Sequence, residues 1–110
     1  MGYDLTIKRG DTRNCIKAIL KDASGNPVNL TDCSINFHMA PLSFFQPTKI
    51  SRAAHVENAV NGEVWVVWVP SETDTAGVYR AEFEVIYSDG KRETFPNNSY
   101  ISIQIINDLG

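Results

Sequence analysis

Glu82 and Glu84 are the first pair of side chains in this sequence whose spacing could support chemistry. Two residues apart on an extended strand, they would share one face with their carboxylates roughly 7 Å apart, as in a glycosidase pair. A general acid also has to be buried so that its pKa rises. This face carries Arg80 as well, and Lys91 is expected nearby. We therefore interpret the two glutamates as part of a solvated, charged face.

The histidines and cysteines do not match any known set of metal ligands or nucleophiles. His38 and His55 have no carboxylate or thiol at the spacing of metal ligands. Cys15 and Cys33 fit no zinc or redox pattern, so we interpret them as buried apolar thiols and leave a disulfide open. No serine lies in a Gly-x-Ser-x-Gly turn. The sequence therefore predicts a protein that is not an enzyme and binds no metal or cofactor.

The composition narrows the class of protein further. The chain has 110 residues, which suits one domain spanning 1–110, and 43% of them are hydrophobic. Its net charge of −3 argues against nucleic-acid binding, because phosphate contacts need a basic patch. The longest apolar stretch, Val64 to Val69, is far shorter than the ~20 residues of a membrane helix. We see no secretory signal and expect the chain to fold in the cytosol.

Apolar and polar residues alternate along most of the chain, which is the period of half-buried β-strands. The clearest strand is 79–87, and further strands are predicted at 12–21, 33–39, 55–60, 63–69, 92–95 and 100–106. Asn61-Gly62 predicts a hairpin with a type I′ turn, and Asp89-Gly90 predicts a second tight hairpin. The one helical turn expected lies at 71–75, after Pro70.

The segment Thr75-Ala76-Gly77-Val78-Tyr79 leads into the clearest strand. In immunoglobulin-type sandwiches a tyrosine at this place packs its ring in the core and bonds its hydroxyl to the backbone across the corner. Gly77 would let the chain turn there without a Cβ clash. Together with turns roughly every 8–12 residues, this corner predicts an all-β fold. We expect an immunoglobulin-like antiparallel β-sandwich of about seven to eight strands without substantial helix.

Four segments follow one another in a recognisable order. They are Arg9-Gly10-Asp11-Thr12, then Leu20-Lys21-Asp22-Ala23-Ser24-Gly25-Asn26-Pro27-Val28-Asn29-Leu30-Thr31, then Ala76-Gly77-Val78-Tyr79-Arg80-Ala81-Glu82-Phe83, and last Asp89-Gly90. In order and spacing they resemble the N-terminal immunoglobulin-like domain of phage baseplate upper proteins and related small tail proteins. The resemblance spans about Leu5 to Ile105.

This resemblance implies a virion structural protein. Domains of that family dock on a tail or baseplate in several copies and present a receptor-binding module. This chain stops at Gly110 without such a module, so we expect a stand-alone adaptor or decoration protein of the tail, baseplate or head. It would be assembled in the host cytoplasm. Its partners would be other virion subunits and further copies of itself, and neither nucleic acid nor a membrane.

The predicted strand 63–69 is apolar on both faces. If Val64, Val66 and Trp68 fill the core, then the other face is made of Trp65, Val67 and Val69. Left bare, such a face is an aggregation risk. Either the N-terminal segment or a loop covers it, or it is a subunit or partner interface. We prefer the interface, with Trp65 as its anchor, because tryptophan is enriched at interface hot spots.

The proline-bounded loop from Pro41 to Pro47 carries the adjacent Phe44 and Phe45. Neighbouring side chains in an extended segment point opposite ways, so one of the two rings should face outward. The loop either folds back onto the edge of the core or inserts into a neighbouring subunit.

A function of another class also fits a sandwich, namely a carbohydrate- or cell-surface-binding module. Such a module needs exposed aromatic rings beside Asp or Asn in one cleft. Trp65 with Asn61 or Glu63 is the one candidate in this sequence.

Overall fold

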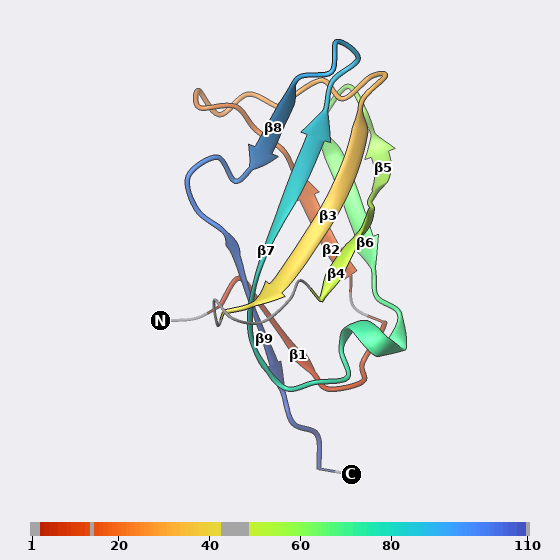
Figure 1. The fold of residues 1–110 in the computed structure, drawn as a ribbon, viewed down its shortest axis with the longest axis vertical. Helices are drawn as coiled ribbons and strands as arrows, with labels where there is room; N and C mark the ends of the chain where they lie inside the picture. Colours follow the sequence, from red (N-terminus) through yellow and green to blue (C-terminus); the bar gives the residue numbers. More distant parts are fainter. Residues whose placement is uncertain (1–2, 14, 43–48, 110) are drawn as a thin grey trace.

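The computed structural model describes residues 3–13, 15–42 and 49–109 (Figure 1). Nine strands are described: β1 (Leu5–Lys8), β2 (Cys15–Ile19), β3 (Ser34–Pro41), β4 (Ile50–Ala53), β5 (His55–Asn58), β6 (Glu63–Val67), β7 (Gly77–Ile86), β8 (Arg92–Phe95) and β9 (Ile101–Ile106). The prediction of an all-β fold is confirmed. Strands β1 and β4, of four residues each, were not predicted. No helix in the described residues is long and apolar enough to span a membrane.

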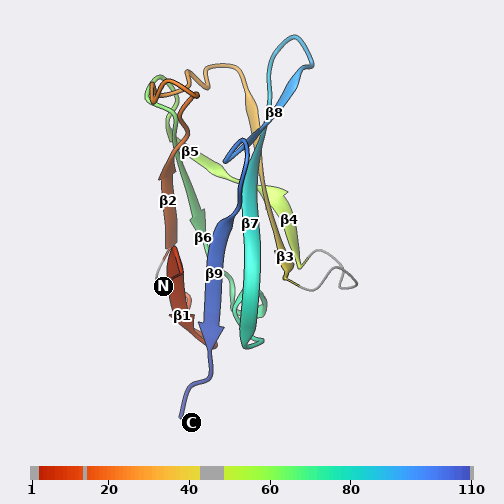
Figure 2. The same cartoon turned by 90° about the vertical axis from the view of Figure 1, so that its left-hand side faces the viewer.

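The strands form two layers that face each other (Figure 2). One sheet has six strands in the order β1-β9-β7-β3-β4, with β8 also paired to β7, and the other has the order β2-β6-β5. β1 pairs with β9 in parallel, and the other pairings between described strands are antiparallel. This is the predicted immunoglobulin-like sandwich, in which each sheet buries one face.

The core lies between the sheets and follows the predicted alternation. Along β7, the side chains at every second position from Tyr79 to Val85 are buried, and those between them are partly exposed. Phe37 of β3 lies in contact with both layers: its ring centroid is 5.3 Å from that of Phe83 and 6.1 Å from that of Trp68. Trp68 directly follows β6, so these aromatic contacts join the two sheets.

The corner before β7 has the hydrogen bond that the sequence predicted. The Tyr79 hydroxyl donates to the carbonyl oxygen of Thr75 at 2.7 Å, and the ring is buried. The glycine predicted at this turn is confirmed, and its backbone conformation, rather than the space around it, is what requires it. A Cβ added there would meet its nearest atom, in the Tyr79 ring, only at 3.7 Å, which is ordinary contact. The glycine is needed because its φ of 155° is one that other residues rarely adopt.

The β5–β6 hairpin is present, but its predicted turn type is wrong. The loop has four residues, 59–62, and Gly62 has a φ of 68° whereas Asn61 is not among the residues with positive φ. A type I′ turn needs positive φ at both central residues. Gly62 is also required for space, since a Cβ there would lie 2.8 Å from the carbonyl oxygens of Leu20 and Val28.

A buried carboxylate that the sequence did not reveal connects the two sheets at one end. Arg52 of β4 donates from Nε to Oε2 of Glu72 at 2.6 Å and from Nη2 to Oε1 at 2.9 Å. The same Nη2 donates to the carbonyl of Val67, at the end of β6, at 2.7 Å. Oε1 of Glu72 also accepts the backbone N–H of Val69 at 2.9 Å. These bonds hold the end of β6 against β4.

Glu72 reaches this position because it ends a short 3₁₀ helix, η1 (Pro70–Glu72). The helical turn was predicted at 71–75, and it begins and ends earlier. Burial acts to raise the pKa of the Glu72 carboxyl. The hydrogen bonds from Arg52 and Val69 outweigh burial and hold that pKa below its usual value of 4.5.

We expect Tyr79→Phe to lower the free energy of unfolding by about 1 kcal/mol, because the corner loses its hydrogen bond while the ring still fills the core. The midpoint of urea unfolding measures the effect. The matched control is Tyr100→Phe at a tyrosine that is 52% exposed, which should leave the midpoint unchanged. Equal midpoints for Tyr79→Phe and the wild type would show that the corner does not stabilise the fold.

We expect Glu72→Gln to destabilise the protein by about 2 kcal/mol at neutral pH. A carboxyl whose pKa is lowered by folding stabilises the native state above its unfolded pKa, and that contribution disappears as pH falls through the folded pKa. The difference between wild type and variant should therefore shrink below pH 4.5, the usual pKa of this carboxyl. Unfolding curves across this range test it, with Glu82→Gln, at a partly exposed glutamate of β7, as the control. A difference that does not change with pH would contradict the assignment.

Candidate functional site

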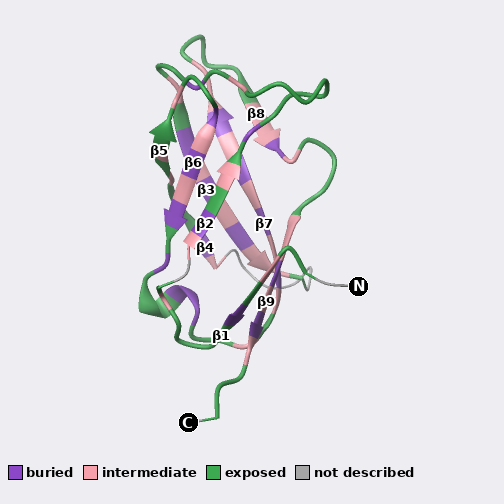
Figure 3. Cartoon of the chain, turned by 180° about the vertical axis from the view of Figure 1, so that it is seen from behind, coloured by how far each residue is buried: buried purple, intermediate pink, exposed green. Residues whose placement is uncertain are grey.

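The outer face of the β2-β6-β5 sheet is the apolar surface that the sequence pointed to, and Figure 3 views the molecule from this side. Val64, Val66 and Trp68 point inward and are buried, as predicted. Val67 and Val69 point outward and are 58% and 48% exposed. The N-terminal strand β1 pairs with β9 in the other sheet, so it does not cover them.

Trp65 lies at the middle of this face and is half-buried by its neighbours. In the register of the sheet it stands beside Lys17 of β2 and His55 of β5. The Lys17 ammonium is 4.6 Å from the indole centroid, and the His55 ring centroid is 5.9 Å away. The indole Nε1 is buried and has no hydrogen-bond partner in the described structure. Trp65 therefore presents no N–H group to a partner, and Lys17 and His55 pack against its ring on either side.

Sequence reasoning missed two residues of this face, Cys15 and Ile19 of β2. Cys15 stands opposite Val67, and Ile19 stands opposite Glu63 and is 51% exposed. The signal was available, since Ile19 is apolar at a position that the alternation of 12–21 assigns to the solvent side. We call Ile19, Trp65, Val67 and Val69 the docking face.

The other predicted site residues are not part of this face. Phe44 and Phe45 lie outside the described residues. Gly77 and Tyr79 belong to β7 in the six-stranded sheet, and Tyr79 is buried there, so their role is structural.

The charged residues singled out in the sequence form separate pairs on the surface. Glu84 accepts a hydrogen bond from Arg92 at 3.4 Å and is 3.7 Å from the His38 ring. His55 is 2.9 Å from Glu57. Nowhere in the described ranges do three His, Cys, Asp or Glu side chains gather as a metal site would require. Glu82 and Glu84 stand in register with His38 and Asn36 of β3, on the face turned away from the core.

The two cysteines are not paired with each other: Cys15 begins β2, and Cys33 directly precedes β3. Both were predicted to be buried, but each is partly exposed. The Cys33 thiol donates to the carbonyl of Thr31 at 3.6 Å. Burial and the nearby carboxylates of Asp32 and Asp89 raise the pKa of the Cys33 thiol. A raised pKa keeps the thiol protonated, which makes it a poor nucleophile.

Comparison with family models finds no match, and comparison with curated proteins finds none either. Among solved structures, the chain is similar to that in "The crystal structure of CopC from Methylosinus trichosporium OB3b", with a TM-score of 0.52 and 14% sequence identity. The match covers 96% of this chain and 87% of that chain. At this identity the likeness concerns the fold alone, and it agrees with a β-sandwich.

Proposed function

We propose that this domain is a non-enzymatic structural protein of a phage particle, which docks on tail, baseplate or head subunits in several copies. The observation that carries the proposal is the docking face, where exposed apolar side chains lie around a half-buried tryptophan on a regular sheet. The four sequence segments that resemble phage baseplate upper proteins supply the phage context.

The geometry of β6 favours binding through side chains. β6 pairs with β2 on one side and with β5 on the other, so both of its backbone edges are in use. Its outward side chains are therefore held at fixed positions. When a partner covers them, the sheet itself loses little conformational freedom, which lowers the entropic cost of binding. Each Å² of apolar surface removed from water contributes about 25 cal/mol. The Arg52–Glu72 hydrogen bonds fix the end of β6, where Val67 lies.

The carbohydrate-binding alternative has less support from the same residues. Sugar-binding aromatic side chains present an open ring face and often a polar group beside it. Here the Lys17 ammonium lies over the Trp65 ring at 4.6 Å, and the indole Nε1 is buried. We therefore favour a protein partner for this face.

We expect Val67→Ser to weaken association with virion subunits, or of the protein with itself, about tenfold or more, because the serine hydroxyl must be desolvated at the interface. The matched control is Val60→Ser, which changes a valine that is 64% exposed on the β5–β6 loop. Multi-angle light scattering, with circular dichroism to check folding, measures the effect.

Two results would contradict the proposal. One is a strictly monomeric wild type that binds no tail, baseplate or head subunit. The other is an equal loss of association in Val67→Ser and Val60→Ser, which would place the contact away from the docking face.

A further inference from the structure

Strand β2 forms one edge of the three-stranded sheet. Only every second residue of β2 hydrogen-bonds to its neighbour β6. Just beyond the two strands, the Leu20 N–H donates to the Gly62 carbonyl at 2.9 Å, so Leu20 belongs to the hydrogen-bonded set. Antiparallel pairs alternate, so Ala18, two residues earlier, also exchanges hydrogen bonds with β6. The backbone N–H and C=O groups of Lys17 and Ile19 then point away from β6, toward the open edge.

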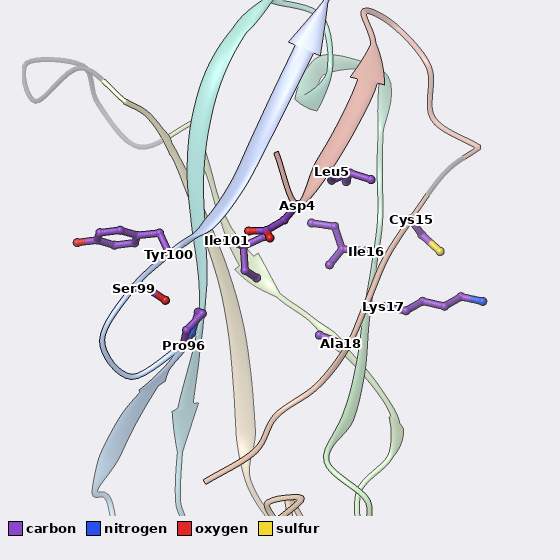
Figure 4. Close-up of a pocket in the computed structure, with 10 residues that line it drawn as sticks. All are labelled: Asp4, Leu5, Cys15, Ile16, Lys17, Ala18, Pro96, Ser99, Tyr100 and Ile101. Carbon is purple, nitrogen blue, oxygen red and sulfur yellow. The ribbon is translucent and has the colours of Figure 1, made fainter. Parts of the chain in front are cut away.

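A groove runs between this edge and the six-stranded sheet. Its larger part is a cavity of about 450 Å³, in which Leu5, Ile16 and Ile101 point toward one another while Lys17 points away (Figure 4). A second hollow of about 230 Å³ shares Ala18, Pro96 and Ile101 with the first and extends along β2 to Leu20. The part of the groove beside Ala18 to Leu20 is mainly apolar, whereas the larger part also has polar residues in its lining, such as Asp4 and Ser99.

Free backbone groups above an apolar groove are the two features that strand addition requires, since main-chain hydrogen bonds give affinity and alternate side chains enter pockets. The first strand does not fill this place, because β1 pairs with β9 instead of β2. We propose that the β2 edge binds an extended segment of a partner protein, which adds a fourth strand to the β2-β6-β5 sheet and inserts every second side chain into the groove.

The charges beside the edge indicate the chemistry of the segment. Lys17 and Lys21 are exposed on and just after β2. The nearest carboxylate on the other wall, Asp4, is already engaged by the Ser102 N–H at 2.8 Å. Glu63 stands in register with Ile19, one strand farther from the edge. The segment should therefore alternate apolar side chains toward the groove with acidic ones toward the lysines.

The same charges argue against a second copy as the occupant. Two β2 edges paired with each other would bring four lysines into one seam, and like charges across paired strands are destabilising. The proposed strand addition uses the outward backbone groups of β2, whereas the docking face uses side chains, of which only that of Ile19 comes from β2. It therefore does not depend on the proposed function.

The test uses an eight-residue, end-capped peptide of alternating valine and glutamate, labelled for fluorescence polarisation, with the whole protein. The comparison peptide replaces each glutamate with lysine. We expect the glutamate peptide to bind at least about tenfold more tightly, because it places carboxylates beside Lys17 and Lys21. Hydrogen exchange should show new protection of the Lys17 and Ile19 amides on binding.

The decisive variant is Ile19→Pro, which removes an outward N–H that β6 does not use and is tolerated on an edge strand. We expect it to weaken peptide binding about tenfold or more, while Ile19→Ser, which keeps the N–H, changes binding by less than about threefold. A double charge reversal, Lys17→Glu with Lys21→Glu, should exchange the preference for the two peptides. This charge-reversal variant tests the proposal even if the Ile19→Pro variant does not fold.

Three outcomes would overturn the proposal of strand addition at β2. If neither peptide binds, Lys17 and Lys21 serve only to prevent the open β2 edge from pairing with strands of other chains. Equal binding to the wild type and to a folded Ile19→Pro would exclude strand addition at β2. Self-association of the wild type that Ile19→Pro abolishes and Ile19→Ser preserves, seen by sedimentation without peptide, would assign the edge to a second copy. If Val67→Ser fails to weaken association, only the proposed function is lost.

Discussion

The packing of Phe37 against Phe83 and Trp68 joins the two sheets, and the docking face depends on it. The ring centroids lie 5.3 and 6.1 Å apart, so β3 and β7 of one layer contact the end of β6 in the other. Side chains on a strand alternate between faces. Once Trp68 is placed in the core, Val67 and Val69 must face outward. The exposed apolar surface is therefore a consequence of the core, and not a separate feature added to it.

The unequal sizes of the two sheets explain the second candidate surface, which is the open edge of β2 with its groove. The six-stranded sheet gains β1 and β8 at its margins, whereas the opposite sheet stops at β2. Because β1 pairs in parallel with β9, nothing in the described chain continues the smaller sheet beyond β2. The result is one open backbone edge with an apolar groove beside it. The two surfaces meet at β2: the side chain of Ile19 is part of the docking face, and its backbone N–H and C=O groups are part of the open edge.

The rim of the sandwich is held by polar contacts that do not follow from the alternation. The Tyr79 hydroxyl fixes the entry to β7, and the Glu72 carboxylate binds both Arg52 and the backbone after β6. The tyrosine corner was predictable because its donor and acceptor lie four residues apart in the chain. The Arg52–Glu72 pair joins residues 20 apart on different elements, and neither side chain has a local pattern that identifies the other.

The sequence by itself determined the all-β class, seven of the strands, the inward faces of β6 and β7 and the tyrosine corner, because all of these follow from local alternation and short spacings. It also named Trp65, Val67 and Val69 as the outward face of β6. Only the tertiary structure decided that β1 joins β9, that β2 keeps a bare edge, that Lys17 covers the Trp65 ring, and that Glu72 is buried against Arg52. The physical reason is that pairing between distant strands depends on how both sheets pack at once, and no local period records that choice.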